Sequence, residues 1–229
     1  MNNLILFGSV AAGVVLGMLL QNQRLILTRL ILSFSGAFLF AISILHLVPD
    51  LFESGDHNIG FWVLGGFIFQ YILDFFSGGV EHGHFHATKN EGLRFGFVTA
   101  LFLHAFIEGM PLAGNATSNS ELLAAIALHK IPISTVLFFG LRQMKVSKGR
   151  SILFLSGFAM MAPLGMWAQE YIPLLSDIHN EIKAIVLGIF FHVSTTIWFE
   201  ATDDHRFNFK KLIAVLAALV VAALTTMMH

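Results

Sequence analysis

His104 and Glu108 are the two residues whose types and spacing most clearly suggest chemistry. They stand four positions apart in the apolar segment LFLHAFIEGM, so a helix would place imidazole and carboxylate on one face. Together these groups can bind a divalent cation. Gly109 follows directly and would allow a second helix backbone to approach closely.

A second polar group, His129 and Lys130, precedes Pro132 in the apolar segment AIALHKIPIS. Pro132 removes a backbone donor and predicts a kink, which a membrane protein tolerates where the backbone lines a cavity or is buried in protein. A single buried histidine is more often a neutral imidazole bonded to a backbone carbonyl. Three such groups on two adjacent helices, His104, Glu108 and His129, favour a shared cation site.

Further polar residues lie in other apolar stretches: His46 and Asp50 in one, and His192 in another. A charged group in a bilayer costs roughly 2.5–3.5 kcal/mol on insertion scales. Such residues are retained where they face a bundle interior and serve a function. We therefore expect His46, Asp50, Lys130 and His192 to lie along a transport pathway.

Composition places these residues in a membrane protein. The 229-residue chain is 56% hydrophobic and 12% charged, with mean hydropathy +0.76, too little charge for the surface of a water-soluble domain. A net charge of -1 argues against a nucleic-acid partner. Because cysteine is absent, a metal would be held by His, carboxylate, amide or backbone oxygen, which suits zinc, iron or manganese.

The apolar stretches predict an all-α, polytopic membrane protein, a bundle of eight transmembrane helices forming a single domain over 1–229. A spanning helix needs roughly 20 mostly apolar residues. The first stretch lacks a basic start and is expected to be a retained helix rather than a signal peptide. The predicted spans are 3–21, 28–52, 58–78, 92–114, 121–142, 150–172, 180–201 and 209–228.

Basic residues predict the orientation of this bundle. All of the 13 lysines and arginines except Lys130 and Lys183 lie in the first, third, fifth and seventh connections or at the adjoining ends of the spans beside them. Because basic connections stay in the cytoplasm, both termini are expected to be extracytoplasmic. The third connection also carries His82, His84 and His86, which predict either a cytoplasmic metal-capturing loop or simply a solvated polar loop.

The order of these motifs resembles that of the ZIP (Zrt/Irt-like) divalent-metal transporters, and the resemblance covers essentially the whole chain. The family's fourth- and fifth-span motifs have the forms His-Asn-x-Pro-Glu/Asp-Gly and His-Glu/Asp-x-Pro-Glu/His-Gly. The corresponding segments here are His104-Ala105-Phe106-Ile107-Glu108-Gly109 and His129-Lys130-Ile131-Pro132-Ile133-Ser134. Other similar segments are His46-Leu47-Val48-Pro49-Asp50, Ser156-Gly157, Pro163-Leu164-Gly165 and Glu81-His82-Gly83-His84-Phe85-His86.

The short loops and the missing targeting segment suit a bacterial inner membrane, so we expect a divergent bacterial member of the family. The resemblance implies an eight-helix bundle that moves zinc, or else iron or manganese, toward the cytoplasm. The metal ion would be substrate, with no prosthetic group and no enzymatic activity, and a homodimer would be usual. His104, Glu108 and His129 match ligand positions, and His46 and Asp50 match positions near the pathway.

Four positions depart from the family pattern. Ala105, Lys130, Ile133 and Ala162 replace family polar or ligand residues, which removes most of a second metal position. We therefore expect a mononuclear centre in which Lys130 acts as a built-in counter-ion to Glu108, since a neutral pair is less costly to bury. The alternative is that Lys130 extends toward an aqueous vestibule and contacts nothing.

Two rival functions remain open at this stage. The missing ligands are also typical of a degenerate membrane protein that binds or senses metal without flux. An intramembrane metal hydrolase, using His46, Asp50 and His192 around a metal-activated water, accounts for fewer of the motifs.

Overall fold

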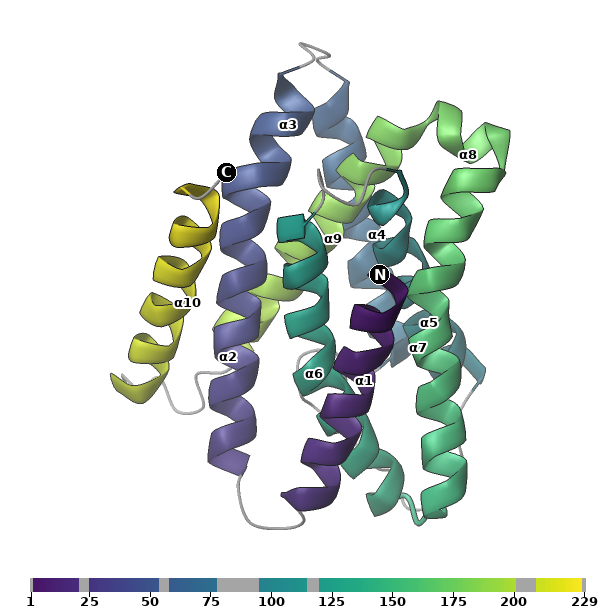
Figure 1. The fold of residues 1–229 in the computed structure, drawn as a ribbon, viewed down its shortest axis with the longest axis vertical. Helices are drawn as coiled ribbons and strands as arrows, with labels where there is room; N and C mark the ends of the chain where they lie inside the picture. The colour runs from purple at the N-terminus through teal and green to yellow at the C-terminus, as the bar shows by residue number, and fades with distance from the viewer. Residues whose placement is uncertain are drawn as a thin grey trace.

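The structure, a computed structural model, describes residues 2–20, 25–53, 58–77, 95–114, 120–200 and 209–227, which are helical with no strand among them (Figure 1). The elements are α1 (Asn2–Leu19), α2 (Leu25–Ile42), the π-helical turn η1 (Ser43–Leu47), α3 (Val48–Phe52), α4 (Ile59–Ser77), α5 (Phe95–Gly109), the 3-10 turn η3 (Met110–Leu112), α6 (Ser120–Gln143), α7 (Lys148–Tyr171), α8 (Pro173–Asp177), α9 (His179–Glu200) and α10 (Phe209–Met227).

Seven segments of the described chain are long and apolar enough to cross a membrane: Asn2–Leu19, Arg29–Phe52, Ile59–Ser77, Phe95–Leu112, Ser120–Gln143, Lys148–Tyr171 and Phe209–Met227. They match seven of the predicted spans to within a few residues. The chain therefore has the helical, membrane-like fold expected from its sequence. The remaining predicted span, 180–201, is described up to Glu200 and is helical there, as α9, but α9 is not among the seven.

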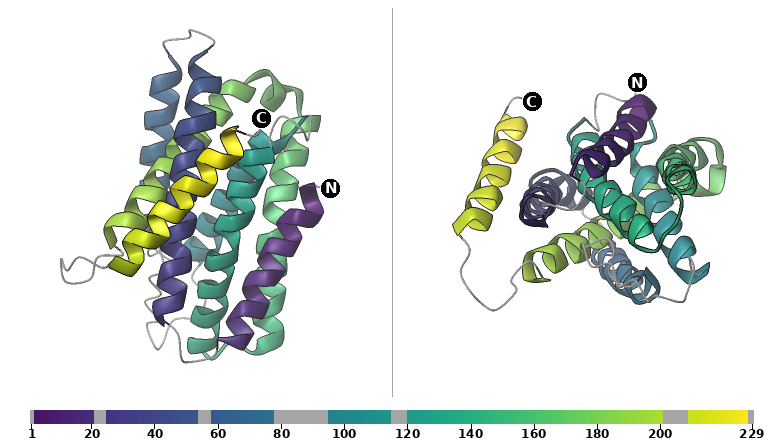
Figure 2. Two further views of the ribbon diagram at one scale, coloured as in Figure 1. Left: turned by 60° about the vertical axis from the view of Figure 1, so that its left-hand side comes forward. Right: turned by 90° about the horizontal axis from the view of Figure 1, so that it is seen from below.

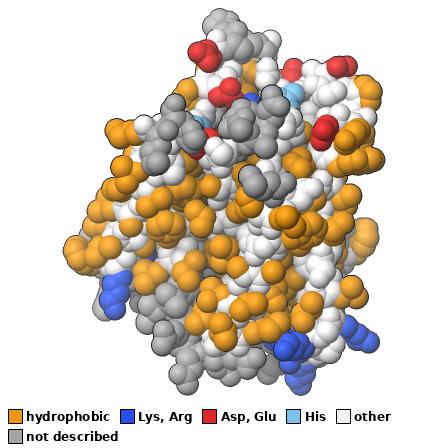
Figure 3. Space-filling model, viewed as in Figure 1, with side chains coloured by type: hydrophobic (Ala, Val, Ile, Leu, Met, Phe, Trp, Pro, Cys, Tyr) orange, Lys and Arg blue, Asp and Glu red, His pale blue; other side chains and the backbone are white. Residues whose placement is uncertain are grey.

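The outer surface of the bundle is apolar around its middle. Large hydrophobic side chains stand exposed on α4 and α10, among them Phe61, Phe75, Leu216 and Val220. Figure 3 shows such side chains over much of one face, with Lys and Arg gathered at its lower end and Asp and Glu at its upper end. An apolar belt between polar ends fits contact with lipid.

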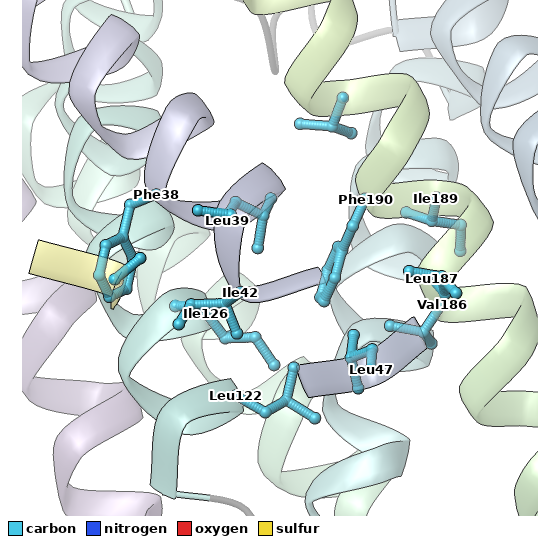
Figure 4. Packing of buried hydrophobic residues seen from close by; sticks show 14 of the residues in the cluster. Phe38, Leu39, Ile42, Leu47, Leu122, Ile126, Val186, Leu187, Ile189 and Phe190 are labelled. Carbon is cyan, nitrogen blue, oxygen red and sulfur yellow. The ribbon is translucent and has the colours of Figure 1, made fainter. Parts of the chain in front are cut away.

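The centre of the bundle is built around α6, most of whose residues are buried. Buried side chains from α2, η1, α6 and α9 pack together, including Phe38, Ile42, Ile126, Leu187 and Phe190 (Figure 4). By contrast, α10 lies at the edge of the bundle, next to α2 (Figure 2). Polar side chains on α6 are therefore placed where lipid does not reach.

Reciprocal glycine contacts bring two helix pairs into close approach. A Cβ added at Gly66 of α4 would overlap the Ile185 carbonyl oxygen of α9, and one at Gly188 of α9 would overlap the Val63 carbonyl oxygen of α4. Gly109 of α5 faces the Ala162 backbone of α7 in the same way. The close approach predicted at Gly109 is therefore confirmed, and the glycines fix α4 against α9 and α5 against α7.

The proline positions have different local effects. Pro132 lies inside α6, which continues as one helix from Ser120 to Gln143, so the kink predicted there stays a prediction. The predicted span 28–52 is less regular than expected, because the π-helical turn Ser43–Leu47 separates α2 from α3. This turn contains His46 and ends two residues before Pro49, and π turns often occur at functional sites.

Candidate metal centre

A buried ion pair between α5 and α6 forms the heart of the candidate centre. Lys130 Nζ donates to Glu108 Oε2 at 2.8 Å, and each side chain is 1% exposed. The Lys130 ammonium also lies 4.9 Å from the centroid of the Phe158 ring on α7, a favourable cation–π position. Lys130 therefore does not extend into a vestibule, and its charge is compensated within the bundle.

His104 lies on the same face of α5 as Glu108, as the spacing predicts. Its Nε2 is 3.9 Å from Glu108 Oε2, and its Nδ1 is 2.9 Å from Gln70 Oε1 of α4. His104 and Gln70 are both almost fully buried. The imidazole is thus held between a carboxylate on one side and an amide on the other.

His129 is also fully buried, and its side chain contacts another helix. Its Nδ1 lies 3.3 Å from Ser35 Oγ of α2. Within the ranges that the structure describes, no group of three or more His, Asp or Glu side chains is arranged to hold a metal ion. The structure therefore joins His104, Glu108 and Lys130 directly, whereas His129 has not closed on them as a third ligand in this conformation.

Apart from Lys130, the positions that depart from the ZIP pattern are packed in apolar surroundings. Ala105, Ile133 and Ala162 are each at most 1% exposed. Ala105 and Ile133 share a cluster with Phe158, and the Ala162 backbone contacts Gly109. These small or aliphatic side chains offer no ligand atom, so the polar part of the centre lies on the side of His104, Glu108 and Lys130.

Two polar residues of α4 extend the centre, and neither was identified from the sequence. Gln70 Nε2 donates to Asp74 Oδ1 at 3.0 Å, and His192 Nε2 of α9 lies 2.6 Å from Asp74 Oδ2. The rings of Phe67 and Tyr71 pack nearly perpendicular to the His192 ring. The spacing of Gln70 and Asp74 in the apolar segment FQYILDFF is the signal that could have found them.

His46 and Asp50 lie apart from this network. His46 Nε2 is 2.9 Å from Thr226 Oγ1 of α10, and Asp50 Oδ2 accepts from Lys183 Nζ at 2.6 Å with the Asp50 side chain 57% exposed. Among the described residues, the hydrolase set of His46, Asp50 and His192 does not form a metal-holding group.

His179 stands beside the Asp50–Lys183 pair, at the start of α9. Burial lowers the pKa of His179 below 6.5, and the charge of Lys183 lowers this pKa further, while Asp50 acts in the opposite direction. The imidazole is therefore biased toward its neutral form.

The predicted metal-capturing residues His82, His84 and His86 lie outside the described residues. Comparison of the sequence with models of known protein families gives no match, and comparison with curated proteins gives none either. Kinship with the ZIP transporters stays a prediction based on the motifs.

Proposed function

We propose that this protein is a divalent metal transporter of ZIP type, with zinc as the first candidate and iron or manganese as alternatives. The observation that carries the proposal is the Glu108 carboxylate, buried to 1% exposure beside His104 in an apolar helix. A carboxylate in such a place requires a cation. The Lys130 ammonium and a metal ion are two cations that can neutralise the Glu108 carboxylate, one after the other.

In this proposal Lys130 forms an ion pair with Glu108 between transport events. An entering metal ion takes the Glu108 carboxylate and the Nε2 of His104 as ligands, with His129 as a third ligand after a local rearrangement. The displaced ammonium stays near the Phe158 ring, 4.9 Å away in the structure. The buried carboxylate is then never left without a positive partner.

The proposed topology has eight spans, with α9 as the seventh and both termini extracytoplasmic. Helix α1 runs away from the end of the bundle that carries α3 and α8, and α10 runs toward that end (Figure 1). At the other end lie the exposed residues Arg142, Lys145, Lys148 and Arg150, which favour a cytoplasmic position. Metal would thus move toward the basic end, across a bacterial inner membrane, in a protein that forms homodimers.

The test is uptake of radioactive zinc by purified protein in vesicles. Glu108→Ala should abolish uptake, and Lys130→Ala should change the apparent zinc affinity or its pH dependence. Glu170→Ala removes an exposed carboxylate of α7 and should leave uptake unchanged. Equal uptake by wild type and Glu108→Ala would refute the proposal.

A metal-binding or sensing protein without flux is the second candidate. It is favoured by the apolar packing of Ala105, Ile133 and Ala162, which leaves few ligands for a moving ion. Zinc binding that depends on Glu108, without uptake into vesicles, would support this candidate instead.

A further inference from the structure

A chain of hydrogen bonds connects the candidate centre to α9 through side chains that the proposed function has not used. It runs from His104 Nδ1 to Gln70 Oε1 (2.9 Å), from Gln70 Nε2 to Asp74 Oδ1 (3.0 Å), and from Asp74 Oδ2 to His192 Nε2 (2.6 Å). Gln70 is 0% exposed and His104 is 1% exposed. Because these side chains are buried, each contact must join a donor to an acceptor, and this constrains which atoms carry hydrogen.

Asp74 determines which groups donate and which accept along this series of hydrogen bonds. An ionised carboxylate only accepts hydrogen bonds, so the Gln70 amide must turn its NH₂ group toward Asp74. On the other side of Asp74, His192 Nε2 must then be the donor. The reversed amide would place Gln70 Oε1 against a carboxylate oxygen, with two acceptors in contact.

The orientation of Gln70 in turn fixes His104. Gln70 Oε1 has no hydrogen to give, so the 2.9 Å contact requires a hydrogen on His104 Nδ1. In a neutral imidazole the lone pair is then on Nε2. That atom is the one 3.9 Å from Glu108 Oε2.

We propose that Gln70, oriented by Asp74, is a positioning residue that holds His104 as its Nδ1–H tautomer and directs the Nε2 lone pair toward Glu108. This inference rests on the proposed function for its purpose, because a metal ion at Glu108 needs that lone pair. Metal-binding histidines are commonly fixed in this way by a hydrogen bond to the other ring nitrogen. In this inference Asp74 affects His104 through Gln70, and His192 does so through Asp74.

Three variants separate this role from simple packing. Gln70→Met removes the acceptor at similar size, so the Nε2–H tautomer, donating to Glu108, becomes available. Asp74→Asn leaves Gln70 in place beside His104. Because the asparagine amide can donate as well as accept, the Gln70 amide can reverse, and both His104 tautomers should be populated. In Gln70→Glu/Asp74→Asn, residue 70 is again an obligate acceptor, and the Nδ1–H tautomer should return.

The measurement is the nitrogen-15 spectrum of the imidazoles in metal-free protein, with His104→Asn used to assign the His104 signals. Zinc affinity is measured on the same samples by competition with a chelator. We expect Nδ1–H in wild type and in the double variant, and about 10–100-fold weaker zinc binding in Gln70→Met and Asp74→Asn. Gln169→Met, which removes another buried amide, on α7, should change neither result.

The outcomes distinguish this inference from the proposed function. Wild-type His104 with hydrogen on Nε2, or on both nitrogens, would overturn the role of Gln70, as would an Asp74→Asn spectrum identical to that of wild type. Absence of zinc binding by wild type would refute the proposed function, while the spectra would still decide the tautomer.

Discussion

Neither the Glu108 carboxylate nor the Lys130 ammonium is stable alone at 1% exposure. Removing one partner of a buried ion pair leaves an uncompensated charge and typically costs about 3–5 kcal/mol. We expect Glu108→Gln and Lys130→Met each to lower the unfolding temperature in detergent. The double variant should recover most of this loss, since no charge is then left without a partner.

The Asp50–Lys183 pair, in which the Asp50 side chain is 57% exposed and the Lys183 side chain 12% exposed, provides a comparison for that cycle. Its contact is also short, at 2.6 Å. A carboxylate exposed to solvent gains only about 0–1 kcal/mol from its partner, so Lys183→Met, which leaves the exposed Asp50 alone, should shift the unfolding temperature little. Equal losses at both pairs would show that the burial of Glu108 and Lys130 does not determine their energetics.

His179 gives a prediction about pH. Its pKa in the folded protein lies below 6.5, first because it is buried and then because Lys183 is near. As the pH falls through 6.5, the unfolded state takes up a proton before the folded state does, so folding stability falls. His179→Gln should make thermal stability in detergent less sensitive to a change from about pH 8 to about pH 5.5; an unchanged sensitivity would contradict this assignment.

The residues of the candidate centre show how far the sequence could predict the site. The i, i+4 spacing placed His104 and Glu108 together because one helix determines that geometry. Contacts between helices, such as His104 with Gln70 or His129 with Ser35, depend on how α2, α4, α5 and α6 pack. Periodicity within one segment cannot supply that information.

At the scale of helices, the reciprocal glycines set the distance between α4 and α9. Gly66→Ala would place a Cβ against the Ile185 carbonyl oxygen, and the backbone cannot yield as a flexible side chain can. We expect a loss of about 1–3 kcal/mol, read as a lower unfolding temperature. The neighbouring Gly65→Ala is the matched control, because a Cβ there meets nothing within 4 Å.

This helix packing also bears on the site, since α4 carries Gln70 and α9 carries His192. Displacing α9 from α4 would lengthen the 2.6 Å contact between His192 and Asp74. If Gly65→Ala were as damaging as Gly66→Ala, the overlap with the Ile185 carbonyl oxygen would not explain the loss at Gly66, and close packing would not govern this interface.

Helix positions themselves were the most predictable level, because a membrane span is recorded in the length of an apolar run. The turn η1 at Ser43–Leu47 was not predictable in the same way. Its sequence, SILHL, lies within one apolar run, Arg29–Phe52, and hydropathy does not distinguish an α-helical turn from a π-helical one. The structure thus adds local geometry to a segment whose extent the sequence already predicted.

At the scale of the whole molecule, the separation of charge between the two ends predicts orientation. The chain contains no cysteine, so single cysteines can report exposure to either side. Lys145 and Asp177 are both exposed, one between α6 and α7 and the other at the end of α8. Helix α7 separates them, so they belong on opposite faces of the membrane.

We expect Asp177→Cys to react with a membrane-impermeant maleimide in intact cells, and Lys145→Cys to react only after the membrane is opened. This result would place the basic end in the cytoplasm, as positive connections require, and would give imported metal its direction of travel. The reverse labelling would place the basic end outside and invert the proposed direction. Labelling of both sites in intact cells would contradict α7 as a membrane span.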